Sequence, residues 1–230
     1  PWAVAAIFFV NGAVLGNWAP RLPAIRDALE LDASVLGLAL AGIGTGGLLA
    51  TPLAAVGIRR LGSRRVVLLS ATVLCLAFVL PALAGTWWAL ALALAVMGGA
   101  DAVMDVAMNA QGVIVEKHRR RSLLNRFHAA WSAGAVTGGL TGAAAAGIGL
   151  AVLVHFALVG GVLLAVALVA HRALVPDGRA APDSVPRSPG RGRYRAGTHA
   201  ARPLARCGRS PDRHERDHHQ RASGGGSRAF

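Results

Sequence analysis

Charged residues are scarce in this sequence: they make up 15% of its 230 residues, whereas hydrophobic residues make up 54%. Soluble domains carry about 25% charged and roughly 45–50% apolar residues. Cysteine occurs only at Cys75 and Cys207, which gives neither a disulfide framework nor the spacing of a metal site. The sequence also lacks a Gly-rich phosphate loop, a Gly-x-Ser-x-Gly elbow and a His-Glu-x-x-His pair. These absences argue against a soluble enzyme and give no sign of a metal or cofactor.

The few charges are unevenly distributed along the chain. Residues 1–171 hold 11 Lys+Arg and 6 Asp+Glu among long apolar runs, and residues 172–230 hold 13 Lys+Arg and 5 Asp+Glu with almost no apolar run. A net charge of +13 would normally indicate a nucleic-acid partner. Because the excess lies in short loops and in the C-terminal stretch, we expect no nucleic-acid binding.

Six stretches are approximately long and apolar enough to cross a membrane. A helix needs about 20 mainly apolar residues to span roughly 30 Å of hydrocarbon. The stretches cover residues 1–18, 34–57, 66–84, 87–115, 122–146 and 149–170. Their short connections require neighbouring helices to run antiparallel. We predict an all-α, polytopic transmembrane helix bundle within residues 1–172, with the lipid bilayer around it.

The connections differ in positive charge, which predicts the orientation of the bundle. Cations cluster after the second, fourth and sixth stretches: Arg59, Arg60, Arg64 and Arg65; Lys117, Arg119, Arg120, Arg121 and Arg126; and Arg172. The other three connections carry no cations or balance them with acids. Positively charged loops stay in the cytoplasm. We therefore expect a multi-pass protein of the inner (plasma) membrane with both termini cytoplasmic.

Glycines recur at four-residue spacing in three of the stretches, at Gly12 and Gly16, at Gly42 and Gly46, and at Gly134, Gly138 and Gly142. This spacing places them on one helix face and lets neighbouring backbones approach closely. The pattern predicts close helix packing; the alternative is a face that leaves room for rocking helices.

The fourth apolar stretch carries the densest set of polar residues. Asp101, Asp105 and Asn109 recur at every fourth position and share one helix face. Counted from Trp87, Asp101 lies about 14 residues into the helix, which is roughly 21 Å at 1.5 Å per residue and close to mid-bilayer. Acids and amides in lipid are costly and mark functional sites. We expect this stripe to face a water-filled cavity or a buried partner.

A carboxylate that takes up a proton on one side of a membrane and releases it on the other provides what a proton-coupled carrier requires. Asp101 and Asp105 are therefore candidates for binding a proton or a substrate. The alternative for Asp105 is an ion pair with a cytoplasmic arginine such as Arg126, which would lock two helices together.

Other stretches contribute fewer polar candidates. Asn11 lies in the first stretch, and His128 and Trp131 share a face of the fifth. Histidine can change charge at physiological pH, and tryptophan can stack on a sugar or an aromatic ligand. The alternatives are that His128 is wetted by the adjoining loop and that Trp131 only packs. His155, alone in the sixth stretch, is expected to be a hydrogen-bonded packing residue.

The connection at residues 58–65, Ile-Arg-Arg-Leu-Gly-Ser-Arg-Arg, resembles the signature loop of the major facilitator superfamily. The resemblance implies a gating loop between the second and third helices, formed by Arg59, Arg60, Gly62, Arg64 and Arg65. The chain departs from the family pattern in two ways: Arg59 stands where the family has an aspartate, and the earlier glycine of the pattern is not in register. That aspartate helps to lock neighbouring helices in one conformation.

Residues 11–23, 104–112 and 127–132 resemble a bacterial branch of uncharacterised inner-membrane carriers that is similar to the fucose–proton symporters. In such symporters an acidic residue of the fourth helix takes part in proton coupling, a role that the resemblance gives to Asp101 or Asp105. The family fold has two six-helix halves with the site between them at mid-membrane. The resemblance covers about residues 1–172 and therefore implies the N-terminal half.

Residues 173–230 are rich in arginine, proline and glycine. Such a composition buries too little apolar surface to fold, so we expect disorder. We interpret this stretch as out-of-frame translation or the end of a truncated reading frame. The alternative is a genuine basic tail that attracts anionic lipid head groups.

Together these features predict proton-coupled transport of a small solute by a major facilitator mechanism, with this chain as a truncated half that pairs with a second half. The alternative is a six-helix membrane protein without transport activity, a remnant or an assembly partner.

Overall fold

The computed structural model describes residues 1–177, and all secondary structure in this range is helical. The helices are α1 (Trp2–Trp18), α2 (Leu22–Ala28), α3 (Ala33–Leu61), α4 (Ser63–Ala77), α5 (Trp87–Arg119), α6 (Leu124–Gly147) and α7 (Val152–Arg172), with 3-10 turns η1 (Ala19–Arg21) and η2 (Leu80–Leu83). The predicted all-α class is thus confirmed. The predictions for the basic tail beyond residue 177 lie outside the described range.

Five segments are long and apolar enough to cross a membrane: Trp2–Ala28, Ala33–Leu61, Ser63–Leu83, Trp87–Arg119 and Val152–Arg172. They correspond to five of the six predicted spans. The predicted span at residues 122–146 forms helix α6, but α6 is not among these five. Its glycine, threonine and serine residues lower its hydropathy. Helix α6 nevertheless packs along α1, just as α3 packs along α5.

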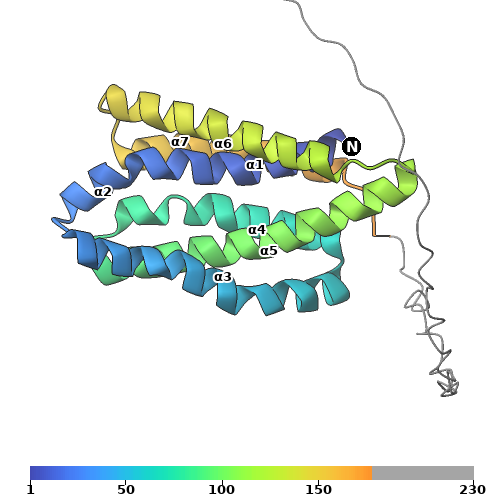
Figure 1. Cartoon of the computed structure of the whole chain (residues 1–230), viewed down its shortest axis with the longest axis horizontal. Helices are drawn as coiled ribbons and strands as arrows, with labels where there is room; N and C mark the ends of the chain where they lie inside the picture. Colours follow the sequence, from blue (N-terminus) through green and yellow to red (C-terminus); the bar gives the residue numbers. More distant parts are fainter. Residues whose placement is uncertain (178–230) are drawn as a thin grey trace, which may run out of the picture. The chain divides into compact units, whose positions relative to one another are not determined.

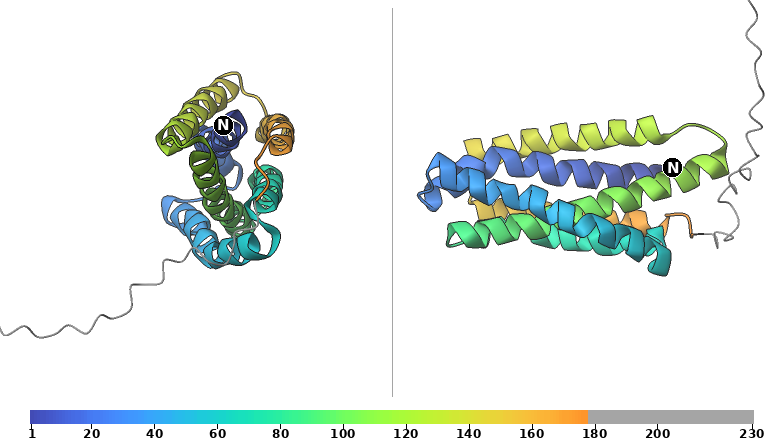
Figure 2. Two further views of the ribbon diagram at one scale, coloured as in Figure 1. Left: turned by 90° about the vertical axis from the view of Figure 1, so that its right-hand side faces the viewer. Right: turned by 60° about the horizontal axis from the view of Figure 1, so that its bottom comes forward.

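The long helices run antiparallel and pack mainly in pairs. Helix α1 lies along α6, and α3 lies along α5 (Figure 1). Seen end-on, α5 lies between α1 and α3, while α4 and α7 lie together on one side (Figure 2). The N-terminus, the α3–α4 and α5–α6 connections and the end of α7 all lie at one end of this bundle. The cation-rich connections predicted from the sequence therefore share one end.

Local sequence explains where the helices begin and end. The Asp32 side chain caps α3 by accepting a hydrogen bond from the Val35 N–H at 2.8 Å. Bonds from the Ser34 hydroxyl and then the Val35 N–H hold the pKa of this exposed carboxyl below its ordinary value. Gly62 has φ of +83°, a conformation that glycine adopts readily, and it makes the sharp turn from α3 into α4.

The glycine stripes lie where helix backbones touch. A Cβ at Gly12 would overlap the carbonyl oxygen of Trp131 on α6, and one at Gly46 would overlap that of Ala95 on α5. The remaining stripe glycines meet neighbouring backbones in the same way: Gly16, Gly42, Gly134, Gly138 and Gly142. The prediction of close packing at these faces is confirmed.

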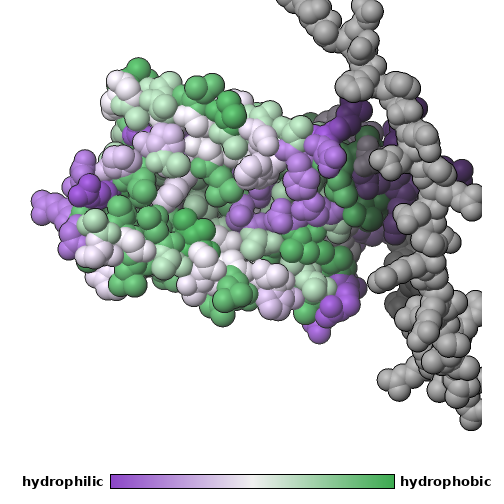
Figure 3. Space-filling view, in the orientation of Figure 1, coloured by the Kyte–Doolittle hydropathy of each residue, from purple (hydrophilic) through white to green (hydrophobic). Residues whose placement is uncertain are grey.

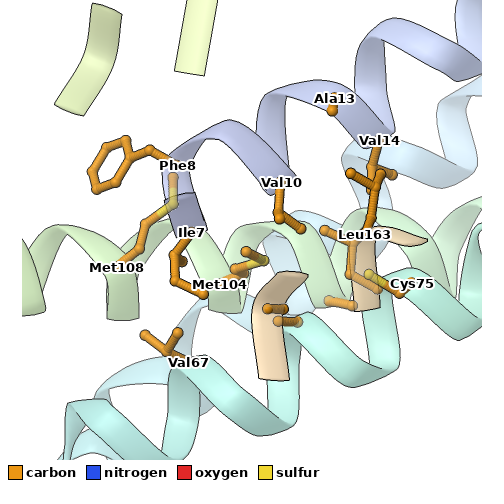
Figure 4. Packing of buried hydrophobic residues seen from close by; sticks show 14 of the residues in the cluster. Ile7, Phe8, Val10, Ala13, Val14, Val67, Cys75, Met104, Met108 and Leu163 are labelled. Atoms are coloured by element: carbon orange, nitrogen blue, oxygen red, sulfur yellow. The ribbon is translucent and has the colours of Figure 1, made fainter. Parts of the chain in front are cut away.

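Apolar side chains fill the space between the helices. Ile7 and Phe8 of α1 pack with Met104 and Met108 of α5, and Leu163 of α7 lies near Cys75 of α4 (Figure 4). Large apolar residues also cover the outside, and hydrophilic residues gather at the two ends of the bundle (Figure 3). An apolar belt between two polar ends is the surface expected of a protein in a bilayer.

Candidate functional site

A polar cavity of about 250 Å³ lies where α1, α5 and α6 meet. It is lined by Asn11, Leu15, Asp101, Asp105, His128 and Trp131. Five of the six candidates predicted from the sequence as a substrate or proton site therefore line one cavity, although they come from three helices. The sixth, Asn109, does not line it. Leu15 was not predicted, because an apolar residue in an apolar helix carries no signal.

Asn11 joins the other two helices at this cavity. Its amide Nδ2 donates to Asp101 Oδ1 at 2.7 Å, and its Oδ1 accepts from the indole Nε1 of Trp131 at 2.8 Å. Only 2% of the Asn11 side chain is exposed. Both ends of the buried amide are satisfied, as the cost of an unpaired polar group requires. A continuous hydrogen-bond chain therefore runs from α5 through α1 to α6.

Asp105 lies one turn beyond Asp101 and has a different partner. The Nδ2 of Asn109 donates to Asp105 Oδ1 at 3.1 Å and to the Asp105 carbonyl oxygen at 2.9 Å. Within the described residues, these bonds stay inside α5 and no ion pair joins Asp105 to Arg126. The proposed lock between Asp105 and that arginine is therefore not formed, and Asp105 is exposed toward the cavity.

His128 stands at the rim of the cavity on α6. Its ring lies edge-on to Phe8 of α1, with centroids 5.2 Å apart and planes at 85°. The side chain is exposed, so a charge on it is not trapped in the apolar interior. The cavity thus combines two carboxylates, an imidazole, an amide and an indole, and these groups can hold a proton or bind a polar solute.

A second buried polar cluster lies near the opposite end of α1. Asn17 Oδ1 accepts from the Thr141 hydroxyl at 2.8 Å and lies 3.1 Å from His155 Nε2. His155 is therefore a hydrogen-bonded packing residue, as predicted. The nearby Arg21 guanidinium donates to the carbonyl oxygen of Leu150. This cluster ties α1, α6 and α7 together and is separate from the cavity.

The predicted gating loop lies at the α3–α4 turn. Arg59 and Arg60 end α3, and Arg65 lies in the first turn of α4; all three are exposed. The Arg64 side chain donates to the carbonyl oxygen of Arg172 at 3.4 Å. The loop therefore contacts the end of α7 through one of its arginines.

A carboxylate from another part of the chain reaches this loop. Asp177, after α7, accepts from the Ser63 hydroxyl and, at 3.0 Å, from the backbone N–H of Arg64. Gln111 of α5 donates to Ser63 Oγ at 2.8 Å and to the carbonyl oxygen of Val175 at 3.2 Å. Asp177 therefore supplies a carboxylate at the N-terminus of α4, within the predicted gating loop. Asp177 lies more than 100 residues from Ser63 along the chain, so nothing in the sequence indicated this contact.

We expect Asp177→Asn to lower the stability of the bundle by about 1–2 kcal/mol. The substitution removes a charge from a helix N-terminus and replaces an acceptor that the Ser63 hydroxyl and the Arg64 N–H use. Thermal unfolding in detergent measures the change. Asp27→Asn, at an exposed acid in α2 with no side-chain hydrogen bond in the described range, is the matched control. Equal effects of the two substitutions would show that the Asp177 contacts contribute nothing.

The antiparallel apolar helices, with a polar cavity where three of them meet, are those of a multi-pass membrane protein. The family model of the Major Facilitator Superfamily matches residues 4–211, most of the chain. The chain belongs to this superfamily. The match extends past residue 172, where the membrane domain was predicted to end. Members of this family generally carry solutes and are not enzymes.

Three curated relatives are similar over part of their length. The chain is 42% identical over 131 residues to an uncharacterized MFS-type transporter of Yersinia pestis, covering 57% of this chain and 34% of the relative. It is 37% identical over 168 residues to an uncharacterized transporter of Sinorhizobium fredii, covering 71% and 45%. It is 32% identical over 139 residues to the membrane protein MosC of Rhizobium meliloti, covering 60% and 34%. The matched part of the chain thus spans less than half the length of each relative.

Proposed function

We propose that this chain takes part in proton-coupled transport of a small polar solute, with Asp101 as the proton-binding group. The observation that carries the proposal is the hydrogen-bond chain from Asp101 through Asn11 to Trp131, which lies at a cavity between three helices. Asp105 and His128 are the polar groups beside it that contact solute or water. No catalytic reaction is assigned to any of these residues.

Proton binding can be coupled to helix movement through the hydrogen bond between Asp101 and Asn11. An ionised Asp101 holds the Asn11 amide through a charge-assisted hydrogen bond, and a protonated Asp101 holds it less strongly. Asn11 belongs to α1, which packs along α6, whereas Asp101 belongs to α5, which packs along α3. Proton binding therefore weakens one link between two helix pairs, and rocking of packed units is how such carriers alternate access.

We further propose that the protein lies in the inner (plasma) membrane with its cation-rich end and both termini in the cytoplasm. Support comes from the clustering of the positive connections at one end of the bundle. A cavity built from one six-helix unit has no opposite wall. A second six-helix half or a second copy of this unit would provide that wall. The gating role of the Arg59–Arg65 loop is part of the same proposal.

A proton-flux measurement tests the proposal. Proteoliposomes with a trapped pH-sensitive dye are given a pH gradient and a panel of sugars, and the parent is compared with Asp101→Asn and Asp105→Asn. We expect solute-dependent proton uptake in the parent, its loss in Asp101→Asn and its partial retention in Asp105→Asn. If the parent shows no solute-dependent proton uptake, the chain is a six-helix membrane protein without proton-coupled transport, which is the alternative function; if Asp101→Asn keeps the parental uptake, Asp101 is not the proton-binding group.

A further inference from the structure

An apolar groove of about 510 Å³ lies between α3 and α4, with α5 as its floor. Apolar side chains such as Leu49 and Leu53 of α3 and Val73 of α4 form its walls. Gly46, Ala50 and Gly57 on α3 and Gly99 on α5 also line it, and close packing at Gly46 and Gly99 holds α3 against α5. The wall residues Leu49 and Leu53 are 72% and 63% exposed. The groove is thus lined by apolar side chains and open on the outside of the bundle.

The groove runs along the bundle and ends at the arginine-rich turn. Its lining extends on α3 from Gly46 to Leu61, which is about 22 Å at 1.5 Å per residue. One leaflet contributes about half of the roughly 30 Å hydrocarbon thickness. A fatty acyl chain that enters from the arginine end can therefore lie in the groove through the full depth of its leaflet.

Positive charge surrounds the end of the groove at Leu61 and Val66. Arg59, Arg60 and Arg65 are exposed there, and among the hydrogen bonds of residues 1–177 their guanidinium groups have no partner. The carboxylate of Asp177, which reaches this turn, accepts from the Ser63 hydroxyl and the Arg64 N–H. The site thus offers three exposed cations beside an apolar groove, which complements an anionic head group on an acyl chain.

The groove and the polar cavity lie on opposite faces of α5. Val96, Gly99 and Val103 line the groove, whereas Asp101 and Asp105 line the cavity. At about 100° per residue, the two sets point in opposite directions from the helix axis. A second half that closed the polar cavity would therefore cover the other side of α5 and leave the groove to lipid.

We propose that the α3–α4–α5 groove binds one anionic phospholipid, with an acyl chain in the groove and the phosphate at Arg59, Arg60 and Arg65. The bound lipid would cover the apolar walls of the groove between α3 and α4, and it would tether the α3–α4 turn to the membrane surface. This site is independent of the proton-binding role of Asp101 and goes beyond the transport function.

Native mass spectrometry of the detergent-purified chain with phosphatidylglycerol or phosphatidylcholine of identical acyl chains tests the proposal. We expect one tightly retained phosphatidylglycerol, and much weaker retention of phosphatidylcholine. The triple variant Arg59→Gln, Arg60→Gln and Arg65→Gln should bind phosphatidylglycerol about a hundredfold more weakly, because each cation near an anionic lipid contributes roughly a factor of five. The control variant Lys117→Gln, Arg119→Gln and Arg121→Gln loses the same charge at the other connection and should bind like the parent.

Filling the groove separates a lipid site from general charge attraction. Val73→Trp, at the exposed rim of α4, should displace the lipid while leaving all arginines in place, and Trp88→Phe, outside the groove lining, should not. Equal binding of the two lipids, parental binding by the arginine triple variant or parental binding by Val73→Trp would overturn the proposal. A dimer of the chain that survives in place of the lipid adduct, and that Val73→Trp dissociates, would show a second copy in the groove and overturn it as well.

Discussion

The fluorescence of Trp131 is expected to change with pH in the parent chain and to lose this change in Asp101→Asn. The indole Nε1 donates to Asn11 Oδ1 at 2.8 Å, and the same amide donates to Asp101 Oδ1 at 2.7 Å. Removing a negative charge two hydrogen bonds away changes the electric field at the indole, because charges act strongly where little water screens them. Asparagine at position 101 keeps the size of the side chain and cannot ionise.

The measurement needs a chain whose only tryptophan is Trp131. Replacing the other four with phenylalanine, at Trp2, Trp18, Trp87 and Trp88, isolates its emission. Asp105 on α5 and His128 on α6 are the other titratable groups that line the same cavity. Asp105→Asn and His128→Gln in the same background are therefore the matched controls, and each should retain a pH response. A response that survives Asp101→Asn and disappears in either control would assign the proton to the other residue.

We expect Gly138→Ala to lower the free energy of unfolding by on the order of 3 kcal/mol. A Cβ at Gly138 would overlap the carbonyl oxygen of Ala13 and lie 2.9 Å from the backbone nitrogen of Asn17. Backbone atoms of α1 cannot move aside without separating the two helices, and overpacking of this kind is strongly destabilising. The displacement would also stretch the hydrogen bond that the Thr141 hydroxyl donates to Asn17 Oδ1 at 2.8 Å.

The neighbouring glycine provides a control of opposite sign. Gly139 has no atom within 4 Å of its would-be Cβ. Gly139→Ala should therefore be neutral or stabilise the chain by up to about 1 kcal/mol, since alanine favours helix over glycine. Thermal unfolding of both variants in the same detergent gives the comparison. Similar stabilities for the two would show that α1 and α6 are not packed backbone to backbone.

Several features of the fold were predictable because they depend on local composition. Long apolar stretches predict helices in lipid, since every backbone polar group must be paired within its own segment there. Four-residue glycine spacing predicted close helix packing but not the partner helices, which the structure shows to be α1 with α6 and α3 with α5. The helix ends shifted by a few residues, and α6 was less apolar than a typical span because its glycines and threonines serve packing.

The polar candidates were also visible in the sequence, because an acid or amide in an apolar stretch has few structural reasons to be there. Asp101, Asp105 and Asn11 were selected on that ground, His128 because histidine can change charge at physiological pH and Trp131 because an indole can stack on a ligand; all five line one cavity. Their transport roles remain predictions. Composition alone did not show that Asn11 joins Asp101 to Trp131, because a hydrogen bond between helices depends on how those helices are rotated and spaced.

The amino-acid sequence alone thus determined the helical class, the alternation of cation-rich and cation-poor connections, and which polar residues lie within apolar stretches. Periodicity and hydropathy act within one segment, so these properties can be read one helix at a time. Only the tertiary structure decided which polar groups meet, that Asp177 reaches the turn at Ser63, and that an open groove lies between α3 and α4 beside the arginines. Each of these depends on the distance between atoms far apart in the chain, and packing of whole helices sets that distance.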